Sequence, residues 1–280
     1  MSESNLDQGT DRRQFLTRAA GTGAGLLVGG SAFAGLLPSV AAAKPGHGKH
    51  SHAHGKGHPK KRDVEILVAA EIAEALAVTT YTNIINTAPF FAHLQSDDQG
   101  YLMAAREEEM SHYLLEEGAT GKPSPFTTFY YPPKMFSDAQ TTLNVLVTLE
   151  DAFIAAYLVG VRDFSTADLK VTAARIMGIE SDHRTLARVV APGVASSDGG
   201  PIEAVTGIQG KAESVDPPNN NGYERTLSWT SIKKAVEALT PFASKSAAEK
   251  AGFDVSKAFK FEPFTPKLPE PLGEFHSFLG

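Results

Sequence analysis

Glu109-Met-Ser-His112 and Glu180-Ser-Asp-His183 are two Glu-x-x-His pairs, and they decide the fold we expect for this chain. In an α-helix, residues three positions apart lie on one face, so the Glu and His of each pair can reach a common ion. One further glutamate in a helical pattern precedes each pair, Glu74 before the first and Glu150 before the second. Four carboxylates and two imidazoles are the ligand count of a two-metal site inside a four-helix bundle.

The helical phase places all six residues on otherwise apolar stripes. A carboxylate within a buried stripe is costly unless it is paired or bound to a metal, and four of them facing one core would repel one another. Two divalent cations would balance the four charges, so the sequence predicts a two-metal site. The predicted metal ligands are Glu74, Glu109, His112, Glu150, Glu180 and His183, and the four glutamates are also the candidate catalytic groups.

The alternative interpretation is that the pairs are accidental. A single Glu-x-x-His on a helix is common and usually faces solvent, but two pairs on apolar stripes, each with an extra glutamate, favour the metal site. Neighbouring glutamates fit less well. Glu71 lies on the flank of its stripe, Glu107 and Glu108 point away from theirs, and Glu116 shares the stripe but falls two turns beyond Glu109, near the predicted helix end.

A weak internal repeat relates the two halves of this region. Tyr81 follows Glu74 by seven residues, and Tyr157 follows Glu150 by the same interval. Seven residues are two helical turns, so each tyrosine shares a face with its glutamate. A core aromatic is the more frequent explanation, and the functional alternative is a hydroxyl that hydrogen-bonds a ligand carboxylate.

Four long helical patterns cover residues 63–87, 97–117, 138–164 and 167–191, with Gly118 expected to end the second. The link from 119 to 137 is rich in proline and aromatic residues. It is long enough to cross the bundle, so the second and third helices can run parallel. The expected fold is therefore all-α, a four-helix bundle over residues 63–192 with a long crossover between helices 2 and 3.

An extension with many turn signals follows at residues 193–280. Two short helices are expected in it, near 231–239 and 246–251, and the rest is expected to be irregular. It lacks the apolar periodicity for a core of its own, so we expect it to pack on the bundle, where it would cap the bundle or form a homo-oligomer contact.

The N-terminal residues 1–43 are expected to be an export signal. Asp11-Arg12-Arg13-Gln14-Phe15-Leu16 resembles twin-arginine signals, a Gly- and Ala-rich apolar stretch follows, and Ala41-Ala42-Ala43 offers a cleavage site. The resemblance implies a partner in the twin-arginine export machinery and a periplasmic or extracellular location. An uncleaved anchor is the alternative. No other apolar run approaches membrane-spanning length.

A basic linker rich in His and Gly occupies residues 44–62 and holds five of the nine histidines. It is expected to be a solvated linker, with metal collection as the alternative. From residue 63 onward, 17 Lys+Arg stand against 29 Asp+Glu, a net charge of −12, which argues against a nucleic-acid partner and suits cations. The chain has no cysteine, which excludes disulfides, iron–sulfur clusters and thiolate zinc sites.

The six ligand candidates with Ile66, Leu67 and Tyr81 resemble the ferritin-like superfamily, and most of all the exported bacterial ferritin-like proteins related to plant desiccation-related proteins. That resemblance implies two Fe or Mn ions as cofactors. Relatives oxidise and store iron, reduce or dismutate peroxide, or activate dioxygen, so we expect a redox protein handling O2, peroxide or ferrous iron. The alternatives are a non-catalytic stress protein of the envelope with a structural metal, and a metal buffer.

Overall fold

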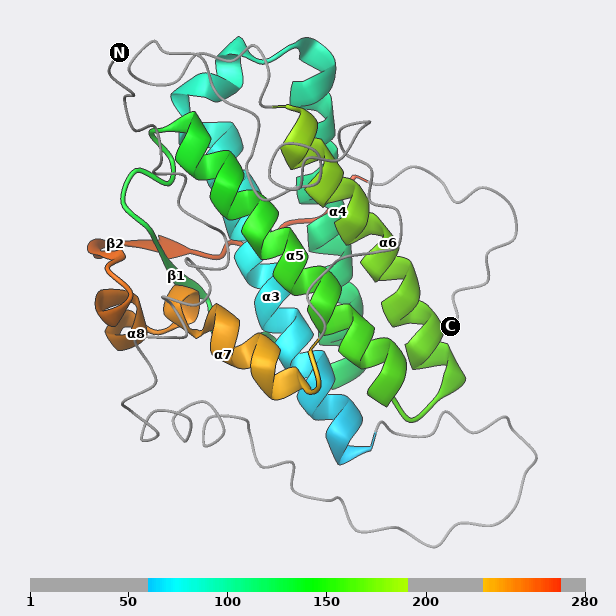
Figure 1. Ribbon diagram of the computed structural model, residues 1–280. Coiled ribbons are helices and arrows are strands. Elements are labelled where there is room, and N and C mark those ends of the chain that lie inside the picture. Colours follow the sequence, from blue (N-terminus) through cyan, green and yellow to red (C-terminus); the bar gives the residue numbers. More distant parts are fainter. Residues whose placement is uncertain (1–59, 191–228, 268–280) are drawn as a thin grey trace, which may run out of the picture.

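Four long helices form the body of the protein (Figure 1). The computed structural model describes residues 60–190 and 229–267, so the predicted signal segment and nearly all of the His-rich linker lie outside the described residues. The helices are α3 (Lys61–Thr87), α4 (Ser96–Thr120), α5 (Ala139–Asp163) and α6 (Ala167–Val189). The predicted four-helix bundle is confirmed, with helix ends within a few residues of those expected.

The local sequence explains where these helices begin and end. The Asp138 side chain accepts a hydrogen bond from the backbone N–H of Thr141 at 2.8 Å, which satisfies a donor that the first turn of α5 leaves free. Helix α4 runs past Gly118 to Thr120 and is capped by Gly121, whose φ of 70° is the left-handed conformation that glycine adopts readily. The expectation that Gly118 ends this helix is therefore wrong.

Asp63 ties the start of α3 to the turn between α5 and α6. Its carboxylate accepts hydrogen bonds from the backbone N–H of Lys60 at 3.0 Å and from the backbone N–H of Ser165 at 2.8 Å. The Ser165 hydroxyl donates a third. This buried carboxylate therefore joins the two helical hairpins at one end of the bundle.

Antiparallel pairs make up the bundle. Tyr157 of α5 contacts Glu74 of α3, and Tyr81 of α3 donates to Glu150 of α5. The partners occur in opposite order along the two helices, so α3 and α5 are antiparallel. Because α3 also packs as an antiparallel hairpin with α4, the second and third helices run parallel, as the long link predicts (Figure 1). This topology brings the inward faces of all four helices together at mid-bundle.

The crossover link and the C-terminal extension form a small sheet that the sequence analysis did not predict. Strand β1 (Thr128–Tyr131) in the link pairs antiparallel with β2 (Asp254–Lys260), with Thr128 opposite Lys260. Helices α7 (Ile232–Ala243) and α8 (Lys245–Lys250) precede β2, close to the two short helices expected there. The extension is thus less irregular than expected in its described part, because β2 finds hydrogen-bond partners in β1.

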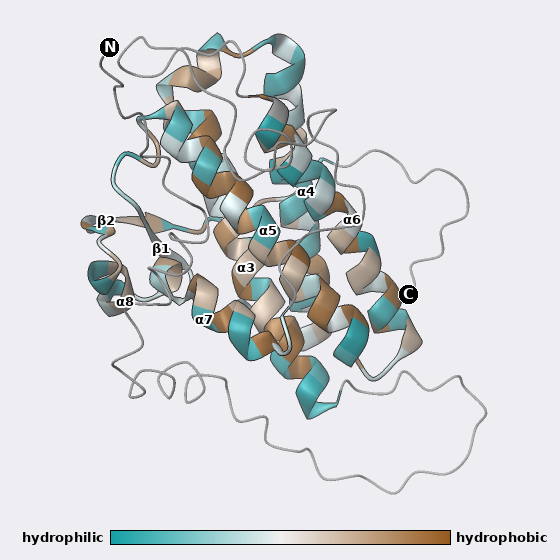
Figure 2. Cartoon of the chain, in the orientation of Figure 1, coloured by the Kyte–Doolittle hydropathy of each residue, from teal (hydrophilic) through white to brown (hydrophobic). Residues whose placement is uncertain are grey.

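Hydrophobic residues are frequent along α3 and α5, as the brown parts of their ribbons show (Figure 2). Phe242, Phe253 and Phe261 from the extension are buried against residues of α3 and α5, and Phe129 of β1 is fully buried with them. Among the described residues, α5 is long and apolar enough to cross a membrane by length and composition, contrary to expectation. Since 78% of its most apolar window is buried inside the bundle, α5 is the central core helix here.

Candidate metal centre

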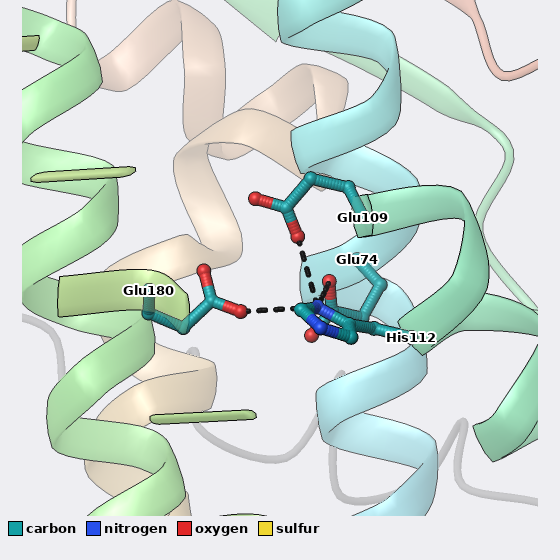
Figure 3. A group of neighbouring side chains, drawn as sticks. All are labelled: Glu74, Glu109, His112 and Glu180. Carbon is teal, nitrogen blue, oxygen red and sulfur yellow. Dashed lines mark ion pairs between the residues drawn. The ribbon is translucent and has the colours of Figure 1, made fainter. Parts of the chain in front are cut away.

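The bundle interior brings together the six predicted ligands, which we call the Glu/His cluster: Glu74, Glu109, His112, Glu150, Glu180 and His183. They form two groups, and within each group one ligand atom per residue lies within 4.8 Å of the others. The first group is Glu74, Glu109, His112 and Glu180 (Figure 3), and the second is Glu109, Glu150, Glu180 and His183. Because Glu109 and Glu180 belong to both groups, these two carboxylates could contribute ligands to both of two cation sites.

The cluster is almost completely shielded from solvent. Glu109, Glu150 and Glu180 are 0% exposed, and the His112 side chain, the most exposed of the six, retains 11%. Several of the carboxylate oxygens have no hydrogen-bond partner, including both oxygens of Glu180. Buried carboxylate oxygens without partners are unfavourable. Oxygen and imidazole donors in this number fit Fe or Mn, so the donor set matches the implied metals.

Both imidazoles turn Nδ1 toward the carboxylates. His112 Nδ1 lies 3.2 Å from Glu180 Oε1, 3.4 Å from Glu109 Oε2 and 3.6 Å from Glu74 Oε2. Figure 3 shows this imidazole between the three carboxylates. His183 Nδ1 lies 3.0 Å from Glu109 Oε1 and 3.7 Å from Glu180 Oε2. Each imidazole therefore presents one nitrogen to one of the two groups.

The electrostatics of the cluster are strongly coupled. Burial raises the pKa of Glu74 and Glu150 well above the usual range, and the neighbouring charges of Glu109 and Glu180 raise it further. Burial would also raise the pKa of Glu109, but the charge of His183, its hydrogen bond and the nearby His112 imidazole lower it. Burial would lower the pKa of His112, but the charge of Glu74 raises it well above the usual range. Without metal, protons therefore balance much of the negative charge.

Two tyrosines donate hydrogen bonds to the outer carboxylates of the cluster. The Tyr81 hydroxyl donates to Glu150 Oε1 at 2.7 Å, and its ring forms a T-shaped contact with the ring of His183. The Tyr157 hydroxyl contacts Glu74 Oε1 on the other side. Each tyrosine comes from the helix opposite its glutamate, so the internal repeat places equivalent bonds on the two sides.

The structure also brings in three glutamates that the sequence analysis set aside. Glu108 was expected to point away, but its Oε2 lies 2.8 Å from His183 Nε2, because a side chain on the flank of α4 reaches α6. Glu116 and Glu71 are 2% and 1% exposed, so both belong to the buried polar region. Glu116 shares the helical stripe of Glu109, and this shared phase could have indicated from the sequence that Glu116 faces the bundle interior.

Comparison with known families agrees with this geometry. The sequence model of a family described as "Ferritin-like domain" matches residues 62–191. That segment contains the four long helices, except for the first residue of α3, and the whole Glu/His cluster. No curated protein matches the chain.

Proposed function

Residues 62–191 are a ferritin-like domain, and we propose that its Glu/His cluster binds two Fe or Mn ions for redox handling of O2, peroxide or ferrous iron. The division of the cluster into two ligand groups that share Glu109 and Glu180 carries this proposal. Each group supplies three carboxylates and one imidazole, a donor set that suits Fe and Mn.

Charge supports two ions rather than one. The six residues hold four carboxylates, and two divalent ions neutralise them while the imidazoles bind as neutral ligands. A single ion would leave two buried carboxylates to be neutralised by protons. The oxygens that lack a hydrogen-bond partner, among them Glu74 Oε2 and Glu150 Oε2, are the atoms that such ions would satisfy.

The chain's own residues divide the work. Glu109 and Glu180 would hold both ions, His112 with Glu74 would complete one position, and His183 with Glu150 would complete the other. The bound ions would supply the redox chemistry.

Two further sets of side chains fix these ligands. The hydrogen bonds from Tyr81 and Tyr157 fix the orientation of the outer carboxylates, and the contact of Glu108 with His183 Nε2 keeps Nδ1 of that imidazole toward the cluster. The apolar residues above and below exclude bulk water.

Metal content decides the first part of this proposal. The full-length protein should carry about two ions per chain after loading with Fe²⁺ or Mn²⁺, and a His112→Ala/His183→Ala variant should lose them. Both proteins keep the linker histidines, so any metal bound there cancels in the comparison. Equal metal content in the two proteins would overturn the assignment.

Turnover decides the second part. The loaded protein should oxidise ferrous iron or consume peroxide, and the double variant should not. Tightly bound metal with neither activity would favour the alternative function, a non-catalytic stress protein with a structural metal. The near-complete burial of the cluster favours that alternative, because a substrate must reach the ions.

We also propose that the protein acts outside the cytoplasm. The resemblance of Asp11-Arg12-Arg13-Gln14-Phe15-Leu16 to twin-arginine signals supports export, and residues 44–62 would then connect the signal to the domain. Replacing both arginines with lysine should trap the protein in the cytoplasm, as cell fractionation would reveal. Unchanged export would refute this route.

A further inference from the structure

The Tyr157 hydroxyl lies between two carboxylates. It contacts Glu74 Oε1 and lies 2.7 Å from Glu116 Oε1. A phenol has one hydrogen, so it can donate to only one of these oxygens at a time. The other contact requires a proton on the carboxyl group itself, which then donates to the phenol oxygen. The geometry therefore describes a row of Glu74, Tyr157 and Glu116 in which the Tyr157 hydrogen can point to Glu116 when Glu74 carries a proton, or to Glu74 when Glu116 carries one.

Glu116 and Glu71 extend this row toward the C-terminal end of α4. Glu116 Oε2 and Glu71 Oε1 are buried and lack a hydrogen-bond partner, whereas Glu71 Oε2 accepts a bond from the Thr120 hydroxyl at 3.4 Å. Thr120 is partly exposed and belongs to the last turn of α4. Glu74, Tyr157, Glu116, Glu71 and Thr120 thus lead from the Glu/His cluster to the surface.

The surroundings of these two carboxyls favour their protonated forms. Burial raises the pKa of Glu71 to about 8, with the charge of Glu117 adding to the effect. Burial also raises the pKa of Glu116 well above its usual range. The groups that face Glu116 are the Tyr157 hydroxyl, His112, and the carboxyls of Glu71 and Glu180.

The internal repeat shows that the row is specific to one half of the bundle. Glu116 follows Glu109 by seven residues, and the residue seven positions after Glu180 in the other half is Ala187. Glu71 precedes Glu74 by three residues, and the residue three positions before Glu150 is Val147. Both counterparts are 0% exposed and apolar. The fold therefore packs without a carboxyl at either position, and two buried acids in one half only are not a packing requirement.

We propose that Tyr157, Glu116 and Glu71 form a proton path between Glu74 at the Glu/His cluster and the surface near Thr120. When a proton on Glu74 is displaced, it passes to the Tyr157 oxygen while the Tyr157 hydrogen, pointing to Glu116, passes to Glu116 Oε1, so the phenol stays neutral. A proton carried on Glu116 Oε2 leaves through one bridging water to Glu71 Oε1, and Glu71 passes its own proton to solvent. Tyr157, Glu116 and Glu71 each hold one proton before and after, while Glu74 has lost one and solvent has gained one.

A third cation site is the competing explanation for two extra carboxylates. Among the described residues, the groups of side chains placed to share a metal ion do not include Glu71 or Glu116. The path rests on the proposed metal function, because binding of a cation to protonated ligands must release protons.

Zinc binding tests the path without any redox turnover. Full-length apo-protein would be mixed with saturating Zn²⁺, and proton release would be followed with a pH indicator in a stopped-flow instrument. The variants are Glu116→Ala, which installs the residue of the other half, and Glu116→Gln, which keeps the shape. Glu65→Gln, on the partly exposed face of α3, is the matched control. Infrared spectra of the same apo-proteins would show the carbonyl band of protonated carboxyls.

Both Glu116 variants should bind as much zinc as the wild type but release protons roughly 10²-fold more slowly, the lower end of what a positioned acid–base group contributes. Each should also lose part of the protonated-carboxyl band, and Glu65→Gln should change neither. Unchanged release rates with full zinc binding would overturn the path and leave the metal function standing. A wild type that binds no zinc would overturn the metal function and the path together. Equal slowing in the control would also refute the path.

Discussion

Glu71→Gln should make the protein more stable at neutral pH and leave its stability unchanged in mild acid. In the folded protein, burial and the nearby charge of Glu117 raise the pKa of Glu71 from 4.5 to about 8. The folded state therefore keeps this carboxyl protonated at neutral pH, whereas the unfolded chain ionises it. Stability falls with pH wherever the folded state binds more protons, so the wild type loses stability from about pH 4.5 up to about pH 8.

The size of the effect follows from that shift. From about pH 4.5 to pH 7 is some 2.5 pH units, and each unit corresponds to about 1.36 kcal/mol, so ionisation of the unfolded chain costs the wild type about 3 kcal/mol at pH 7. Glutamine does not titrate and can still accept the bond from Thr120. The difference in unfolding free energy between the variant and the wild type should therefore be about 3 kcal/mol larger at pH 7 than at pH 4, in favour of the variant.

Urea unfolding of both metal-free proteins, followed by circular dichroism at several pH values, measures this difference. Other groups that titrate affect both proteins alike, so the pH dependence of the difference isolates Glu71. A difference in unfolding free energy that stays constant between about pH 4 and about pH 8 would refute the reasoning, because Glu71 would then ionise equally in both states.

Three other predictions concern separate parts of the molecule. The pKa of both imidazoles, His112 and His183, is raised, so binding of Mn²⁺ must displace protons from them. The Mn²⁺ affinity, measured by equilibrium dialysis, should rise about tenfold per pH unit for each proton displaced. A pH-independent affinity would contradict this. Asp63→Ala should cost about 2 kcal/mol in thermal unfolding, because its hydrogen bonds outweigh burial and lower its pKa. That stabilisation is present above the pKa of Asp63 in the unfolded chain and is lost as the pH falls through its lower pKa in the folded protein. A destabilisation by Asp63→Ala that is as large in strong acid as at neutral pH would refute it. Phe261→Ala, at a ring 7% exposed and 4.6 Å from that of Tyr113, should cost about 3 kcal/mol, and a loss below about 1 kcal/mol would show that the extension does not support the bundle.

Helical phase was enough to predict most residues of the candidate site. Glu74, Glu109, Glu150 and Glu180 lie on stripes that are apolar for several turns, and a stripe defines which face of a helix turns inward whatever its neighbours are. The spacing of each Glu-x-x-His pair then directs an imidazole to the same face. The six residues could be named from the sequence because each depends on local periodicity and on the cost of burying a charge.

Helix neighbours and their offsets came only from the tertiary structure. Glu108 lies on the flank of α4, and only the packing of α6 beside that flank lets it reach His183. Glu116 shares a stripe with Glu109, but its bond to Tyr157 depends on how far α5 is displaced along α4. The pairing of β1 with β2 joins segments more than a hundred residues apart. Local periodicity defines which way a side chain faces, whereas its contacts depend on packing between distant segments, and no single stretch of sequence encodes that packing.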